Sequence, residues 1–142
     1  EAVKIIAKKL DCETLKIDTV KAMPKSFAAR ILVGGGQVAM NIIPEIKPID
    51  KDLSIYDEII IGTPIWAGKC ASPFNTLFEN KALCEKVTAV FTYSGGGDND
   101  GCIKALTKIL PNMKRNVALA DSKSKFASTN DAKLDEFIKF FD

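Results

Sequence analysis

The chain has 142 residues, 46% of them hydrophobic, and a formal net charge of +2. This length and composition suit one domain spanning residues 1–142, and no apolar run approaches the roughly 18 residues that span a bilayer. The chain contains no histidine, which excludes the commonest general base, the usual catalytic triads and most catalytic zinc sites. We therefore expect any chemistry to belong to a cofactor. Because both signs of charge are mixed along the chain, neither nucleic acid nor a membrane is an expected partner.

Four cysteines are present, and no two of them form a CxxC pair. They lie at Cys12, Cys70, Cys84 and Cys102. This spacing predicts reduced thiols in a cytoplasmic protein, and it predicts no metal site.

The first ten residues, EAVKIIAKKL, follow a helical period. The predicted apolar face consists of Val3, Ile6, Ala7 and Leu10. Because no N-cap residue precedes this pattern, we expect the chain to begin inside a helix of an N-terminally incomplete domain. The next segment, CETLKID (residues 12–18), alternates between apolar and polar residues and predicts a strand.

Residues 19–50 are less regular. Phe27, Ile31 and Leu32 indicate a short helix, which the three glycines at 34–36 are expected to interrupt. The segment YDEIIIG (residues 56–62) predicts a strand that is buried on both faces, as in a parallel sheet.

The second half of the chain alternates between predicted helices and strands. Ser72 and Pro73 are expected to open a helix, with Ser72 as the cap. The predicted strands are 86–94 and 116–120, and Asp100 is expected to cap the helix between them. The inner stripes of the three helices are Phe74, Leu77 and Phe78; Ile103, Leu106, Thr107 and Leu110; and Leu134, Phe137, Ile138 and Phe141.

Strands that alternate with helices predict an α/β fold with a doubly wound, mostly parallel sheet. Two unusual loops follow predicted strands, namely TPIWAGKCASP from residue 63 and SGGGDNDG from residue 94. Because ligands of such sheets bind at the carboxyl ends of the strands, both loops are expected at the ligand-binding edge.

Together these loops could hold a planar ligand. Trp66, the single tryptophan, offers a flat aromatic face, while the glycines 95–97 expose backbone N–H groups without side chains in the way. The alternative interpretation is that Trp66 covers the sheet edge beside two ordinary turns.

The motifs GTPIWAG after an isoleucine-rich strand, SPF at the next helix and FTYSGGG after the following strand resemble the flavodoxin family. The resemblance extends over essentially the whole chain. It implies a three-layer α/β/α fold with a five-stranded parallel sheet of order 2-1-3-4-5, and FMN as the cofactor.

The resemblance also implies roles for individual residues. Trp66 would pack on the isoalloxazine, Ala67 and Gly68 would bring main chain near flavin N5, and Thr63 and Pro64 would shape the ribityl side. The pyrimidine edge would meet the second loop. The predicted cofactor-binding residues are therefore Thr63, Pro64, Ile65, Trp66, Ala67, Gly68, Ser94, Gly95, Gly96 and Gly97, and no side chain is predicted to be catalytic.

The chain departs from the family at its beginning, because the first strand and the phosphate-binding loop are missing from it. We expect that strand to lie between those predicted at 12–18 and 56–62, and without it Ile59–Ile61 would have a free edge that favours a homodimer. If the phosphate is held elsewhere, Lys69 and Lys123 are the candidates.

The resulting hypothesis is an FMN-binding protein that acts in electron transfer or as a small flavin-dependent oxidoreductase, for example of the NAD(P)H:quinone type. Its partner would be a redox protein or a small-molecule electron acceptor. The alternative is a non-redox interaction protein that keeps the fold without the cofactor. Cys70 is expected to be a bystander thiol, since Lys69 is the one basic residue near it in sequence, and Asp98 and Asp100 are expected to bind no metal.

Overall fold

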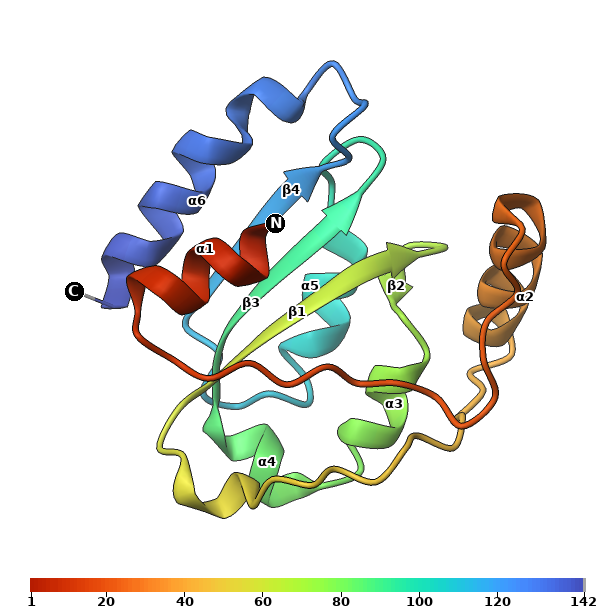
Figure 1. Ribbon diagram of the computed structural model, residues 1–142, viewed down its shortest axis with the longest axis horizontal. Coiled ribbons are helices and arrows are strands. Elements are labelled where there is room, and N and C mark those ends of the chain that lie inside the picture. Colours follow the sequence, from red (N-terminus) through yellow and green to blue (C-terminus); the bar gives the residue numbers. More distant parts are fainter. Residues whose placement is uncertain (142) are drawn as a thin grey trace.

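The computed structural model describes residues 1–141, apart from the side chains of Phe27 and Ile31. Its sheet has four strands in the order β2-β1-β3-β4 (Figure 1). The parallel strands are β1 (Ile59–Trp66), β3 (Val87–Ser94) and β4 (Arg115–Ala120), and the two-residue β2 (Lys69–Cys70) returns antiparallel to the end of β1.

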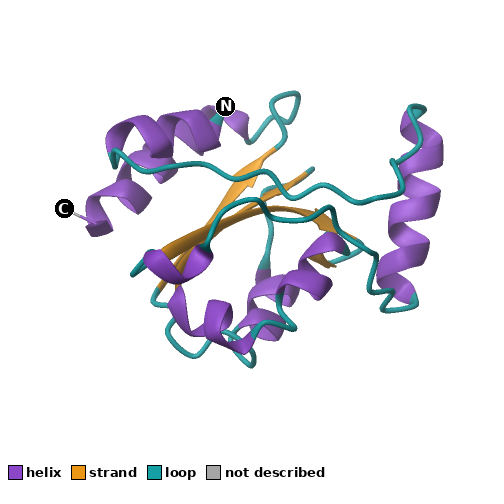
Figure 2. Ribbon diagram, turned by 60° about the horizontal axis from the view of Figure 1, so that its bottom comes forward, coloured by secondary structure: helices purple, strands orange, loops and turns teal. Residues whose placement is uncertain are grey.

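Helices cover both faces of this sheet. On one face lie α1 (Ala2–Lys9) and α6 (Asn130–Ile138), and on the other lie α3 (Pro73–Leu77), α4 (Lys81–Lys86) and α5 (Asp100–Leu106) (Figure 2). Short 3-10 helices span Leu53–Ile55, Ala127–Thr129 and Lys139–Phe141. The α/β fold with three layers is therefore confirmed. Among the described residues, no helix has the length and apolar character needed to cross a membrane.

Each face of the sheet has its own hydrophobic core. Val90 on β3 packs in one core with Leu83 of α4 and Leu106 of α5. Its neighbour Phe91 points to the opposite face and packs in the other core, with Phe137 of α6. This alternation along one strand follows from the two-residue period of β structure.

The first helix is confirmed, but its predicted inner face was partly wrong. Ala2 and Ile6 are buried, whereas Val3 is 48% exposed. The buried residues point toward α6, and Lys9 forms an ion pair with Asp135 of that helix, with 3.0 Å between Nζ and Oδ1. The buried stripe of α1 is therefore the one that packs in the core shared by α6 and the strands β3 and β4.

The predicted strand at residues 12–18 is wrong, because that segment is extended but pairs with no strand of the described chain. Ile17 packs against the α3–α5 core, while Leu15 is 41% exposed. Correspondingly, no strand of the described residues pairs with Ile59–Gly62 on the side away from β3. An alternating pattern predicts a strand conformation, but the sheet needs a hydrogen-bonded neighbour to complete it.

The helix α2 (Phe27–Ala39) runs through the three glycines, so the predicted interruption is also wrong. It stands at the side of the sheet, between long connecting segments (Figure 1). The helix faces the end of β1 at Gly34, since a β-carbon added to this glycine would lie 3.2 Å from Trp66 Cε3. The glycine is therefore useful in the helix, because it allows this close approach.

Polar bonds connect α2 and the segment after it to residues 69–76. Ser72 Oγ donates to Gln37 Oε1 at 2.6 Å, and Lys69 Nζ donates to Asn41 Oδ1 at 2.9 Å. Asn75 Nδ2 donates to the carbonyl oxygen of Ile42 at 3.1 Å. The side-chain bonds of α2 and of the segment after it are thus concentrated on β2 and the start of α3.

The remaining predicted elements are confirmed with shifted limits. Ser72 does precede the first residue of α3, but its hydroxyl bonds Gln37 and does not cap the helix. Asn99, one residue before the predicted Asp100, is the N-cap of α5, and Thr107 is exposed outside the buried stripe. The short α4 was missed, because its six residues hold too few apolar repeats to show a period.

We predict different effects for two glycine substitutions in α2. Gly36→Ala should raise the free energy of unfolding by about 1 kcal/mol, because alanine is the better helix former and no atom lies within 4 Å of its new β-carbon. Gly34→Ala should raise the free energy of unfolding by less, or not at all, because the new β-carbon would press on Trp66. Urea denaturation of both variants measures the difference. Equal stabilisation would show that α2 does not pack against the indole.

Candidate functional site

The two unusual loops lie at the same edge of the sheet, as expected. Thr63 and Pro64 of β1 pair in parallel with Thr92 and Tyr93 of β3, so both strands end side by side. The end of β4 joins them, because Asp121 N donates to the carbonyl oxygen of Ser94 at 2.9 Å. The site therefore has three adjacent strand ends, of which the sequence analysis singled out two.

Trp66 is the last residue of β1, so the prediction that Thr63–Trp66 form a loop beyond the strand was wrong. The residues after it, Ala67 and Gly68, form a two-residue turn, and Lys69 pairs back with Trp66. Both turn residues have positive φ angles, +46° and +77°. This geometry is the one that a tight hairpin with right-handed twist requires.

The indole of Trp66 is half-buried, and the backbone of α2 at Gly34 lies against it. This contact gives the ring a fixed orientation at the rim of the sheet. Ile65 beside it packs against the α3–α5 core, so its side chain supports the strand end from below.

Thr63 lies deeper than expected for a residue that contacts a ligand. It is 2% exposed, and its hydroxyl accepts a hydrogen bond from Ala71 N at 3.2 Å. The carbonyl oxygen of Pro64 accepts a second bond from the same amide, also at 3.2 Å. These bonds hold the β1–β2 hairpin closed. The ribityl roles of Thr63 and Pro64 remain predictions.

The second loop, Ser94–Gly97, is closed by its own first residue. Ser94 Oγ accepts a hydrogen bond from Asp98 N at 2.9 Å. Gly97 has φ +75°, and a β-carbon there would lie 3.3 Å from Cβ of Ala120. Both the conformation and the space at this position therefore favour glycine.

The backbone N–H groups of Gly95, Gly96 and Gly97 make no hydrogen bond within residues 1–141. Gly95 and Gly96 are exposed, so their donors are open to solvent or to a ligand. Three successive donors at this edge of the sheet suit a ligand whose edge carries carbonyl oxygens and ring nitrogens.

A cleft of about 500 Å³ lies beside Trp66, which is a volume typical of small-molecule sites. Of the ten predicted residues, Trp66 alone lines it. Its other walls come from α2, α3 and the segments before and after α2, and they carry the cations Lys16, Arg30 and Lys47.

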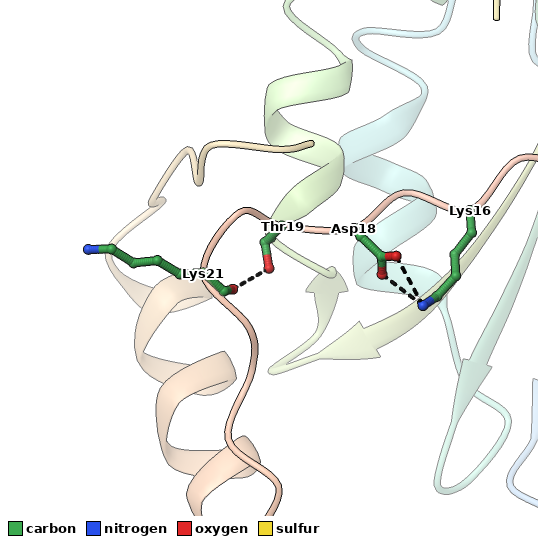
Figure 3. Close-up of polar contacts among 4 residues, drawn as sticks. All are labelled: Lys16, Asp18, Thr19 and Lys21. Carbon is green, nitrogen blue, oxygen red and sulfur yellow. Dashed lines mark hydrogen bonds and ion pairs between the residues drawn. The ribbon is translucent and has the colours of Figure 1, made fainter. Parts of the chain in front are cut away.

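One wall of this cleft is the segment 16–19, which Figure 3 shows together with Lys21. Lys16 Nζ lies 2.8 Å from Asp18 Oδ1, and the Lys16 ammonium holds the pKa of that carboxyl below its usual value. Thr19 Oγ1 donates to the backbone oxygen of Lys21 at 2.5 Å, while the ammonium of Lys21 extends away from the other three residues. With one carboxylate among several cations, the cleft carries an excess of positive charge.

The sequence analysis missed Gly34 and the three cations of the cleft as site residues. No local pattern marks them, because they come from three segments that only the fold brings to Trp66. Lys69, named as a candidate phosphate ligand, donates to Asn41 instead, and Lys123 lies in the exposed loop after β4.

The acidic residues near the second loop have structural contacts. Asp100 N donates to Asp98 Oδ1 at 3.4 Å. In the described part of the chain, no group of three potential ligands could hold a metal ion. Cys70 is buried at 7% exposure and touches a second thiol, Cys102.

The sequence was compared with models of protein families. The model described as Flavodoxin matches residues 38–139, which is well over half of the chain. The chain belongs to this flavodoxin family. No curated protein matches it significantly.

Several solved structures share the fold. A protein of Bacteroides eggerthii, provisionally described as a flavoprotein, aligns with a TM-score of 0.71 and 23% identity over 96% of this chain and 87% of that one. A similarly described protein of Bacteroides uniformis aligns with a TM-score of 0.69 and 22% sequence identity, over 97% of this chain and 88% of that one. A flavoprotein of Lactobacillus acidophilus in complex with FMN aligns with a TM-score of 0.61 and 21% sequence identity, over 94% of this chain and 89% of that one. At these identities the likeness concerns the fold.

The hairpin turn provides a test of the site's backbone. Ala67 has φ +46°, a conformation that costs an alanine about 1–2 kcal/mol. Ala67→Gly should raise the free energy of unfolding by about 0.5–1 kcal/mol after the entropy of glycine is included. Ala67→Val should lower it, because a β-branched residue fits this conformation least well. Thermal unfolding of the wild type and the two variants measures their order of stability. A valine variant more stable than the wild type would contradict the positive φ angle at position 67.

Proposed function

We propose that the protein binds FMN at the carboxyl ends of β1 and β3 and acts in electron transfer or as a small flavin-dependent oxidoreductase. The observation that carries this proposal is that Trp66 and the open backbone donors of Gly95–Gly97 come from the ends of two adjacent parallel strands. The family and the FMN complex of one similar structure support it.

The described residues fit the different parts of this cofactor. Trp66 offers a stacking face, and the N–H groups of Gly95–Gly97 offer donors to the carbonyl and nitrogen edge of the ring. The cations Lys16, Arg30 and Lys47 line the cleft beside Trp66 and can attract a phosphate. When bound, the flavin supplies the capacity to accept and release one or two electrons.

The protein would contribute position and access. The α2 contact holds the indole in one orientation, and the Ser94–Asp98 bond holds the second loop in its closed shape. No side chain of this edge is proposed as an acid or base. The electron donor or acceptor would be a redox protein or a small molecule that reaches the ring. The four cysteines, none of them in a disulfide in the described residues, agree with a reducing cytoplasm.

A second candidate is a non-redox interaction protein that retains the fold. The contact between Gly34 and Trp66 favours it, since it gives the tryptophan a structural role without a ligand. The side of Ile59–Gly62 away from β3, which no described strand covers, would then serve for pairing with a second copy. An absorbance spectrum of gently purified protein separates the two candidates, because flavin bands support only the first.

Trp66→Ala should weaken FMN binding by about 1–3 kcal/mol, because stacking area is lost. Trp66→Phe is the matched control and should lose less, since it keeps an aromatic face. Quenching of flavin fluorescence during titration gives the affinities. Wild-type affinity in a folded alanine variant would refute the assignment of Trp66.

Lys47→Ala should weaken the binding of FMN by about 0.5–1 kcal/mol at low salt but leave riboflavin unaffected, because riboflavin lacks the phosphate. Lys108→Ala, which removes an exposed lysine of the segment after α5, controls for the loss of net charge. Equal effects on both ligands would mean that the cleft beside Trp66 does not hold the phosphate.

A further inference from the structure

Two buried thiols connect the loops of the candidate site. The sulfur atoms of Cys70 and Cys102 lie 2.8 Å apart, and the two residues are 7% and 1% exposed. Cys70 is in β2, directly after the Ala67–Gly68 turn and Lys69. Cys102 is in the first turn of α5, directly after the loop that begins at Ser94. The contact thus bridges segments that are more than thirty residues apart in sequence.

The backbone beside the thiols holds them in this position. A β-carbon added to Gly101 would lie 3.1 Å from the carbonyl oxygen of Gly68, so the first turn of α5 rests on the hairpin turn. On the other side of Cys70, Ala71 N is bonded to Thr63 and Pro64. The approach of the sulfurs is therefore built into the packing of two regular elements.

The other two cysteines have different surroundings. Cys84 is buried, and its thiol donates to the carbonyl oxygen of Phe78 at 3.4 Å. Cys12 is exposed. Neither is recorded in contact with a second thiol in the described residues, so the chain contains internal controls for thiol reactivity.

The environment also favours a reactive sulfur at one member of the pair. The contact with the Cys70 thiol lowers the pKa of Cys102, against the opposing effect of burial. The same contact, together with burial, raises the pKa of Cys70. Because the thiolate is the nucleophile, Cys102 is the member that reacts first with a small oxidant.

We propose that Cys70 and Cys102 form a redox-responsive dithiol that peroxide converts to a disulfide, covalently joining the two loops of the candidate site. Disulfides in reducing compartments are commonly transient and redox-sensing, which agrees with such a role. The inference concerns the thiols alone and does not depend on the binding of FMN.

The reaction balances with hydrogen peroxide as the oxidant. The Cys102 thiolate attacks one peroxide oxygen, the O–O bond breaks, and a sulfenic acid forms while the departing hydroxide takes a proton and leaves as water. The Cys70 sulfur then attacks the sulfenic sulfur, the S–O bond breaks, and hydroxide leaves with the thiol proton as a second water. The two sulfurs lose two electrons in total, and the peroxide oxygens gain them.

The test uses the full chain carrying Cys12→Ser, which prevents links between molecules. The protein is treated with a small excess of peroxide, without added flavin, and the remaining thiols are alkylated before digestion and mass spectrometry. We expect a linked peptide pair containing Cys70 and Cys102, a loss of two hydrogen atoms, and alkylation of Cys84 only after unfolding. Recovery of both cysteines as alkylated thiols, or oxidation of Cys102 without the link, would overturn the proposal.

A second measurement examines the geometry. Gly101→Ala should slow disulfide formation several-fold, because the new β-carbon presses on the Gly68 carbonyl and separates the segments. Gly36→Ala, on exposed helix surface, should leave the rate unchanged. Amide hydrogen exchange in residues 66–70 should slow on oxidation and recover with a thiol reductant. An unchanged rate in Gly101→Ala together with unchanged exchange would show that the sulfurs meet by another route.

Discussion

The parallel pairing of β1 with β3 is the constraint on which the site depends. It brings the ends of two strands together, and thereby the turn after Trp66 and the loop after Ser94. The pairing requires a glycine at position 62, because a β-carbon there would overlap the ring of Phe91 on the neighbouring strand. Phe91 in turn packs edge-on against Phe137 of α6, with ring centroids 6.4 Å apart. Phe91 therefore connects the register of β1 and β3, through Gly62, with the packing of α6 on the sheet, through Phe137.

Beyond this pairing, the site is built from backbone geometry. The hairpin turn has two residues with positive φ, the second loop ends in a glycine with positive φ, and Ser94 closes that loop through a main-chain bond. Such an edge presents open N–H groups of Gly95–Gly97 and the aromatic ring of Trp66. This composition suits a protein whose chemistry would come from a bound group, and it agrees with a chain that contains no histidine.

The sequence predicted those features that depend on short-range pattern. The strand at 86–94 and the stripe of Leu134, Phe137 and Ile138 were predicted in this way, and the helical stripe meets its core with a fixed period. Residues 12–18 show why this reasoning has a limit, since an alternating pattern does not reveal whether a neighbouring strand is present. The glycines of α2 show another limit. A helix-breaking signal was overridden because the absent side chain at Gly34 allows contact with Trp66. The meeting of Cys70 with Cys102 and the cations of the cleft depend on the tertiary fold and have no local signal.

The attachment of α2 has a mechanical consequence. Ser72 donates to Gln37 of α2, and Lys69 and Asn75 donate to the segment that directly follows this helix. The backbone of α2 also rests on the indole of Trp66, while long connecting segments lead to the helix and away from it. The helix is therefore attached to the edge of the sheet, through the β1–β2 hairpin and the start of α3. Any event that tightens or shifts the hairpin would be transmitted to a thirteen-residue helix at the side of the molecule.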